Sequence, residues 1–200
     1  MVWRISKRYI AGTSLTDALN CVRQLNDQGM SATLDVLGED STSREQALKG
    51  EALYQQALSE IDAQSLDANI SVKLSMLALR FDEELCIEIL QKLIRSAEFH
   101  DSFVRIDMED STVTQQTLGI YRRLRKETDR VGTVVQAYLR STEDDVRQLM
   151  DESETHLRLC KGIYVEPESL AFKGFTEVQD AFLRNLEQML RGGIRKVGIA

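Results

Sequence analysis

Short β-rich segments alternate with longer helical segments along the chain, and this alternation limits the choice of fold more than any other feature. The β-rich segments do not alternate cleanly between apolar and polar residues, which is typical of strands buried on both faces of a parallel sheet. A parallel sheet covered by helices is therefore predicted. The expected helices span about 14–28, 43–62, 82–99, 113–128, 143–151 and 176–191, and the expected strands lie in 31–39, 69–75, 103–110, 133–139, 157–167 and 196–200.

Two architectures fit six such units. A doubly wound sheet could be complete with six strands, but its usual phosphate signature G-x-G-x-x-G is absent. A (β/α)8 barrel needs eight units and typically ~250 residues. The sequence stops at Ala200, inside an expected buried strand, and this favours the barrel. The predicted fold class is α/β of the (β/α)8 TIM-barrel type, incomplete, with about six βα units in one domain over residues 1–200.

Composition excludes several classes of protein. Lys and Arg number 25 against 32 Asp and Glu, and the resulting net charge of −7 disfavours nucleic-acid binding. The three cysteines form no C-x-x-C pair and are predicted to be reduced core residues of a cytosolic chain. Only two histidines are present, so no metal site is predicted. No apolar run approaches the ~20 residues of a membrane span.

The stretch 157–167 combines apolar strand residues with two cations, Arg158 and Lys161. A buried cation is costly unless it meets an anion, and Gly162 leaves space for a close approach to the backbone. The stretch is expected to end a strand that faces an anionic or electron-rich ligand. An edge strand with both cations in solvent is the alternative.

Polar residues gather at the expected carboxyl ends of the strands, which form the working face of a parallel barrel. We expect Lys73 to pair with Asp107, and Glu39 to pair with a cation that the chain lacks. The acidic runs 82–84 and 143–145 are expected to be solvated helix caps. The residues at the strand ends are Asp35, Glu39, Lys73, Asp107, Glu109, Asp110, Gln136, Arg158, Lys161 and Tyr164.

Five segments together resemble the bacterial proline dehydrogenase family, flavoenzymes that oxidise L-proline. They are residues 8–12, 34–39, 71–75, 104–111, and 135–139 combined with 158–164. The resemblance implies FAD-dependent oxidation of L-proline to 1-pyrroline-5-carboxylate in proline catabolism, with electrons passed to a membrane quinone. It also implies a cytoplasmic protein that associates peripherally with the inner membrane.

Site residues follow from the same resemblance. It implies that Arg158 reaches the N5 region of the flavin and that Glu39 is half of an ion-pair gate. At position 163, Ile stands where alanine is common in the family, and it is expected to crowd the flavin edge. The resemblance assigns Gln136, Arg158, Lys161, Gly162 and Ile163 to FAD, Lys73, Asp107 and Tyr164 to catalysis, and Asp35, Lys73, Leu159 and Tyr164 to the substrate.

The family's last two strands and its final helix, which carries paired arginines for the proline carboxylate, would follow Ala200. We therefore expect weak or absent activity, and self-association through exposed strand edges. Two alternatives stay open. One is a catalytically inactive barrel fragment, and the other is a Schiff-base aldolase using Lys73 or Lys161, which needs a neutral lysine.

Overall fold

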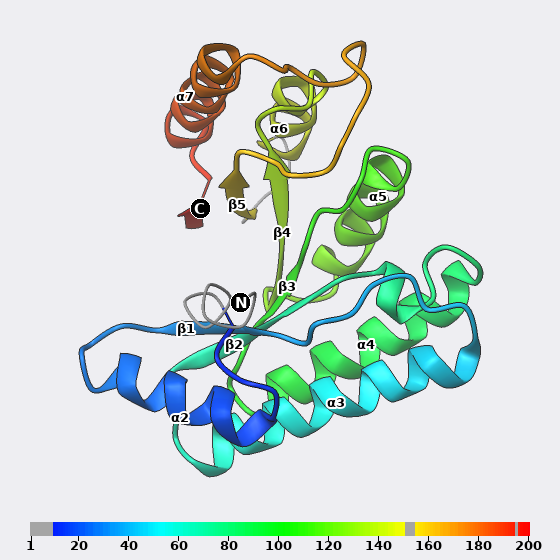
Figure 1. The fold of residues 1–200 in the computed structure, drawn as a ribbon, viewed down its shortest axis with the longest axis vertical. Coiled ribbons are helices and arrows are strands. Elements are labelled where there is room, and N and C mark those ends of the chain that lie inside the picture. Colours follow the sequence, from blue (N-terminus) through cyan, green and yellow to red (C-terminus); the bar gives the residue numbers. More distant parts are fainter. Residues whose placement is uncertain (1–9, 151–154, 195) are drawn as a thin grey trace, which may run out of the picture. The chain divides into compact units, whose positions relative to one another are not determined.

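The computed structural model describes residues 10–150, 155–194 and 196–200. Helices and strands alternate along the chain, as predicted (Figure 1). The chain divides into two compact units, Met1–Val104 and Arg105–Ala200. Each unit has parallel strands and helices of its own. The prediction of a single domain stays a prediction.

The first unit carries two paired strands and three long helices. Strand β1 runs parallel to β2, with Ala32 opposite Ala68 and Asp35 opposite Ser71. Helix α2 contacts β1, and α3 contacts both β2 and α4, which lies beside it (Figure 1). The elements are α2 (Leu15–Asn26), β1 (Ala32–Asp35), α3 (Arg44–Ala63), β2 (Ala68–Val72), the 3-10 turn η1 (Ser75–Leu77) and α4 (Glu83–Phe99).

Local sequence explains where these helices begin. Ser14, Ser43 and Asp82 precede α2, α3 and α4, and each side chain accepts a hydrogen bond from the backbone N–H three residues later. Helix α4 then buries an apolar stripe, and full burial of one Leu or Ile side chain contributes about 1.5–3 kcal/mol. The buried residues of α4 are Leu85, Cys86, Ile87, Ile89, Leu90, Leu93, Ile94 and Ala97.

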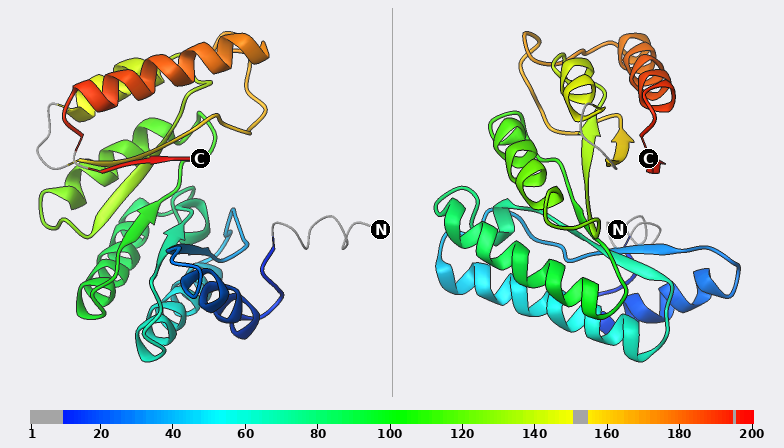
Figure 2. Two further views of the ribbon diagram at one scale, coloured as in Figure 1. Left: turned by 90° about the vertical axis from the view of Figure 1, so that its left-hand side faces the viewer. Right: turned by 180° about the vertical axis from the view of Figure 1, so that it is seen from behind.

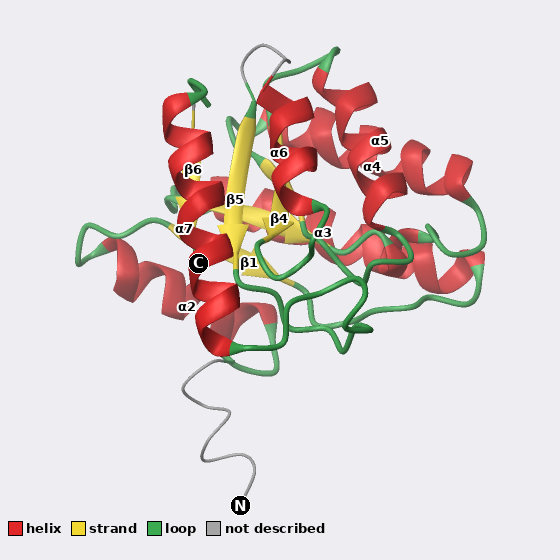
Figure 3. Ribbon diagram, turned by 90° about the horizontal axis from the view of Figure 1, so that it is seen from above, coloured by secondary structure: helices red, strands yellow, loops and turns green. Residues whose placement is uncertain are grey.

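The second unit holds three strands paired in chain order. Strand β5 runs parallel to both β4 and β6, with Val135 opposite Leu159 and Leu159 opposite Ile199. Helix α6 contacts β4 and α7 contacts β5 (Figure 3), and these two helices lie side by side (Figure 2). The elements are α5 (Thr114–Arg125), β4 (Val131–Gln136), α6 (Thr142–Met150), β5 (His156–Cys160), α7 (Phe175–Arg191) and β6 (Lys196–Ile199). Strand β3 (Val104–Ile106) begins at the last residue of the first unit and continues into the second.

Strand β4 has the character expected of a strand inside a parallel sheet, because all six of its residues are buried. Several strands are shorter than predicted. The expected strand 103–110 is only Val104–Ile106, since the polar run 107–110 leaves the sheet as a loop. Likewise β1 ends at Asp35, and residues 36–39 are loop. The predicted polar residues therefore stand at or beyond the carboxyl ends of the strands, except Arg158, which lies in the middle of β5.

Candidate functional site

In the first unit, the ends of β1 and β2 bring together Asp35 and Lys73. The Lys73 Nζ lies 2.6 Å from Asp35 Oδ2, and the Lys73 side chain is mostly covered whereas Asp35 is exposed. The hydroxyl of Tyr54, a fully buried residue of α3, donates to Asp35 Oδ1 at 3.2 Å. The carboxylate is thus held from one side by a tyrosine and positions the ammonium on the other.

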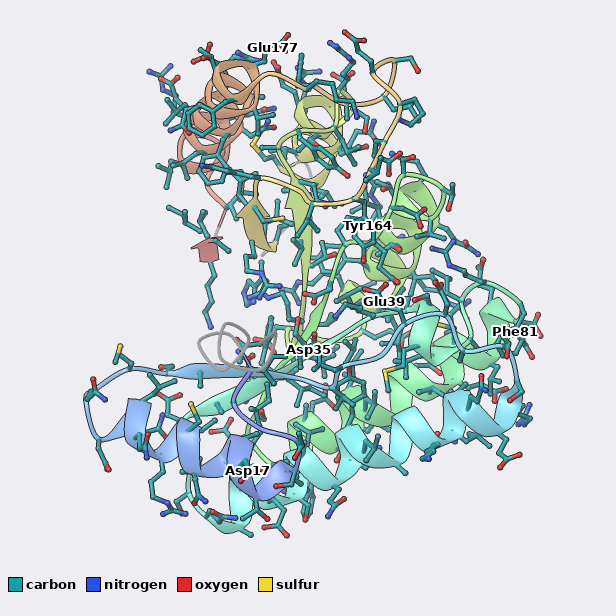
Figure 4. All side chains as sticks on the ribbon, in the orientation of Figure 1. Asp17, Asp35, Glu39, Phe81, Tyr164 and Glu177 are labelled. Atoms are coloured by element: carbon teal, nitrogen blue, oxygen red, sulfur yellow. The ribbon has the colours of Figure 1, made fainter. Side chains whose placement is uncertain are left out.

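Glu39 lies on the exposed loop after β1, and Figure 4 labels both Glu39 and Asp35. The next residue, Asp40, has a positive φ of 51° and pairs with Arg80 Nε at 2.5 Å. That ion pair fixes the loop immediately beyond Glu39. The proposed gate role of Glu39 stays a prediction.

In the second unit, Arg158 on β5 is ion-paired with Asp107, which directly follows β3. The expected partner of Asp107 was Lys73, but the structure gives each of these two residues a partner inside its own unit. The expected pairing would join the units and stays a prediction. Within the described residues, the buried Nε of Arg158 has no hydrogen-bond partner, which leaves one donor for a ligand.

A second arginine, Arg105 on β3, lies close to Arg158 and Asp107. Its Nη1 donates to the backbone carbonyls of Thr133 and His156, at 3.4 and 3.3 Å. Burial, together with the positive charge of Arg158, lowers the pKa of Arg105 to about 10, so it is still charged at neutral pH. Two guanidinium groups therefore share the neighbourhood of one carboxylate, Asp107.

Gln136 ends β4 and is buried, and its Nε2 donates to the backbone carbonyl of Glu109 at 2.7 Å. Gly162, just beyond β5, has a φ of +102°, and a Cβ there would lie 2.1 Å from the Tyr138 ring. The tyrosine ring thus occupies the space that a side chain at position 162 would need. Only glycine fits this turn without displacing the ring.

The remaining predicted residues have different surroundings. Lys161 is exposed, with its Nζ 5.4 Å from the centroid of the Phe175 ring, and Ile163 is 87% exposed. Tyr164 is half-buried on the loop between β5 and α7 (Figure 4). Leu159 is fully buried. Its expected contact with the substrate stays a prediction.

Two further groups of this region have shifted pKa values. Burial raises the pKa of Tyr138 to about 12, and the negative charge of Glu166 adds to this effect. Burial also raises the pKa of the Cys160 thiol, against the opposing charge of Arg158. Cys21, Cys86 and Cys160 are all free thiols, but only Cys86 is fully in the core.

Sequence reasoning missed the partners that hold these side chains in place. Tyr54, Arg105 and Glu166 carry no local signal, because their contacts join residues between 19 and 55 positions apart. Arg105 and Tyr138 do stand inside the segments that resemble the family. The run 143–145 was also misread in part, since Asp145 is buried and accepts from Gln115 and Ser141.

No group of three or more His, Cys, Asp or Glu side chains in the part of the chain that the structure describes could hold a metal ion. None of its helices combines the length and the apolar character needed to cross a membrane.

The amino-acid sequence is similar to that of a known protein family. The family described as Proline dehydrogenase matches residues 18–174. "Proline dehydrogenase 2" of Bacillus subtilis (strain 168) is 37% identical over 186 residues, which are 93% of this chain and 61% of that protein. "Proline dehydrogenase" of Deinococcus radiodurans is 30% identical over 199 residues, 96% of this chain and 63% of that protein. The chain thus spans about three fifths of the length of these relatives.

Solved structures with a similar fold are also found among proline utilization A proteins. Proline utilization A (PutA) from Bdellovibrio bacteriovorus, inactivated by N-propargylglycine, matches with a TM-score of 0.87 and 23% identity, over 99% of this chain and 25% of that one. PutA from Corynebacterium freiburgense matches with a TM-score of 0.77 and 22% identity, over 91% and 22%. At this identity the likeness concerns the fold alone, and it confirms the predicted α/β class of the barrel type.

Proposed function

The chain belongs to the proline dehydrogenase family, and we propose that it takes part in the oxidation of L-proline with FAD as its cofactor. The product would be 1-pyrroline-5-carboxylate. Its formation removes a hydride from a ring carbon and a proton from the ring nitrogen, which leaves a C=N double bond. When bound, FAD supplies the two-electron acceptor for that hydride.

The observation that carries this proposal is the cation on β5. Arg158 is fixed by Asp107 yet retains a buried Nε donor without a hydrogen-bond partner among the described residues. Gly162, just beyond β5, has a backbone conformation that excludes a side chain and packs against the Tyr138 ring. A reduced flavin carries additional negative charge, so a guanidinium with an unpartnered donor fits this cofactor.

Each predicted cofactor residue can then be given a proposed role in binding FAD. Arg158 would donate to the ring, with Arg105 adding positive charge behind it. Gln136 would present its amide from the end of β4, in the orientation set by the Glu109 carbonyl. Lys161, Gly162 and Ile163 would border the cofactor from the loop that follows β5.

The first unit would supply the groups for the substrate. Lys73 is an ammonium donor whose position is set by Asp35, and Asp35 is in turn held by Tyr54. A substrate carboxylate would accept from Lys73 in competition with Asp35. Asp107 and Tyr164 stay proposed catalytic residues, Leu159 a proposed substrate contact, and Glu39 the proposed gate.

The contacts of the two lysines argue against the Schiff-base alternative. That chemistry needs a neutral amine, whereas Lys73 touches a carboxylate and Lys161 lies over an aromatic ring. The carboxylate contact stabilises the charged form of Lys73. The proposed electron acceptor is a quinone, reached by peripheral association with the membrane, and family membership is its support.

A single-turnover experiment tests the proposal, because it detects even a slow reaction. The purified 200-residue chain is incubated with FAD, freed of excess cofactor and mixed anaerobically with L-proline. Bleaching of the flavin band with formation of one equivalent of pyrroline product per flavin is expected, and D-proline serves as the control. Failure to retain FAD, or retention without bleaching by L-proline, would overturn the proposal.

A further inference from the structure

One carboxylate is buried in a loop that also carries fully exposed apolar residues. The segment 161–174 joins β5 to α7, and Ile163 and Val165 are 87% and 98% exposed, whereas Glu166 is only 6% exposed. Removing a carboxylate from water is costly unless donors replace the water. Glu166 must therefore have partners inside the second unit.

Both oxygens of this carboxylate accept hydrogen bonds from a single residue, Ser111. Glu166 Oε1 accepts from the backbone N–H of Ser111 at 2.6 Å, and Oε2 accepts from the Ser111 hydroxyl at 2.6 Å. Ser111 lies on the loop between β3 and α5, four residues after Asp107. Hydrogen bonds to an ionised acceptor are shorter and stronger than neutral ones, so this pair is a firm link between the two loops.

The same carboxylate compensates for a weak start of α5. Val113 occupies the N-cap position of α5 and provides no side-chain hydrogen bond, and the first turn of α5 contains no acidic residue. A negative charge near a helix N-terminus is favourable. Glu166 brings that charge from the distant loop.

Other contacts also hold this loop to the rest of the second unit. At the distal end, the Phe172 N–H donates to the Tyr138 carbonyl at 2.8 Å, and the Arg140 guanidinium lies 4.3 Å from the Phe172 ring centroid. At the proximal end, Gly162 packs on the Tyr138 ring. Between them, Lys173 Nζ donates to the Glu166 carbonyl, and the Glu166 side chain joins the stretch after Tyr164 to the loop after β3.

We propose that Glu166 is a positioning residue that fixes the Lys161–Tyr164 turn to the loop after β3, and so holds the two parts of the proposed flavin site in the second unit together. This inference rests on the proposed function. Glu166 itself touches neither cofactor nor substrate in this proposal. It acts through the position of Tyr164 on one side and of Asp107 on the other.

The chain offers a matched control two residues away. Glu166→Gln replaces one acceptor oxygen with an amide donor that cannot accept from Ser111. Glu168→Gln makes the same change of charge and size on the same loop, at an exposed position. Because Glu166→Gln loses a hydrogen bond to a charged group, the dissociation constant for FAD should rise at least about tenfold in this variant and stay unchanged in Glu168→Gln.

Two variants separate positioning from folding. Glu166→Asp keeps the negative charge on a shorter side chain and should retain part of the FAD affinity that Glu166→Gln loses. Ser111→Ala removes only the hydroxyl donor and should weaken FAD binding by a smaller factor, with no further loss when combined with Glu166→Gln. If Glu166→Gln does not fold, Ser111→Ala decides the matter, and FAD affinity equal to the parent would overturn the proposal.

The readouts distinguish the two proposals. If the parent chain binds FAD but Glu166→Gln and Glu168→Gln bind it equally well, the positioning role is wrong and the proposed function stands. If the parent chain binds no FAD, the proposed function is wrong and the positioning role falls with it. Hydrogen exchange of the Ser111 amide without FAD gives an independent readout, since only Glu166→Gln should accelerate it.

Discussion

Gly162 and Tyr138 are packed so closely that a Cβ on Gly162 would lie 2.1 Å from the ring carbon Cδ1 of Tyr138. The glycine also has a φ of +102°, which side-chain-bearing residues rarely adopt. Space and backbone conformation therefore require glycine at the same position. This contact fixes the point at which the chain leaves β5 and enters the proposed cofactor loop.

Gly162→Ala should destabilise the chain, because alanine at this φ is strained by about 1–3 kcal/mol even before the ring is displaced. Thermal unfolding measures the effect. Gly119→Ala is the control, since Gly119 is exposed in the helix α5 with nothing within 4 Å, and it should stabilise by about 0.4–1 kcal/mol. Equal melting temperatures for Gly162→Ala and the parent would contradict the packing described here.

Arg158→Met should keep the far-UV circular dichroism and weaken FAD binding about tenfold or more, because a charge-assisted donor is lost. It should also lower stability, since it leaves Asp107 without its guanidinium partner. Adding Asp107→Asn should then recover stability without recovering FAD affinity. Recovery of both would mean that Arg158 serves the ion pair alone and does not bind the cofactor.

Lys73→Met should raise the KM for L-proline about tenfold, because the ammonium donor for the substrate carboxylate is removed. Lys49→Met on the exposed face of α3 is the control. Steady-state dye reduction on FAD-loaded protein gives the two constants separately. A lower melting temperature with unchanged KM and kcat would instead assign Lys73 to the stability of the first unit.

Short-range patterns were enough to predict the helices. The caps at Ser14, Ser43 and Asp82 act within three residues, and the apolar stripe of α4 repeats within the helix. Strand lengths were overestimated because a strand ends where its neighbour stops pairing, which is a property of the sheet. The polar run after β3 illustrates this, since the pattern alone did not separate strand from loop.

The members of the candidate site were also predictable, because charged residues at the ends of buried strands are visible in the sequence. Their partners were not. The structure pairs Lys73 with Asp35, 38 residues away in the chain, and the expected pairing of Lys73 with Asp107 stays a prediction. Ser111 and Glu166 lie 55 residues apart in the chain. Only the folded backbone brings such residues within hydrogen-bonding distance.

Tyr138 predicts a distinct pH dependence of stability. Burial and the charge of Glu166 raise its pKa from 10.0 to about 12. The native state therefore holds this proton at pH values where the unfolded chain has lost it, so the stabilising contribution is fully present below about pH 10 and is lost as the pH rises towards about 12. Urea unfolding of the parent and of Tyr138→Phe across this range measures it. The parent should lose stability faster than the variant, and parallel losses would show that the phenol titrates normally in the folded protein.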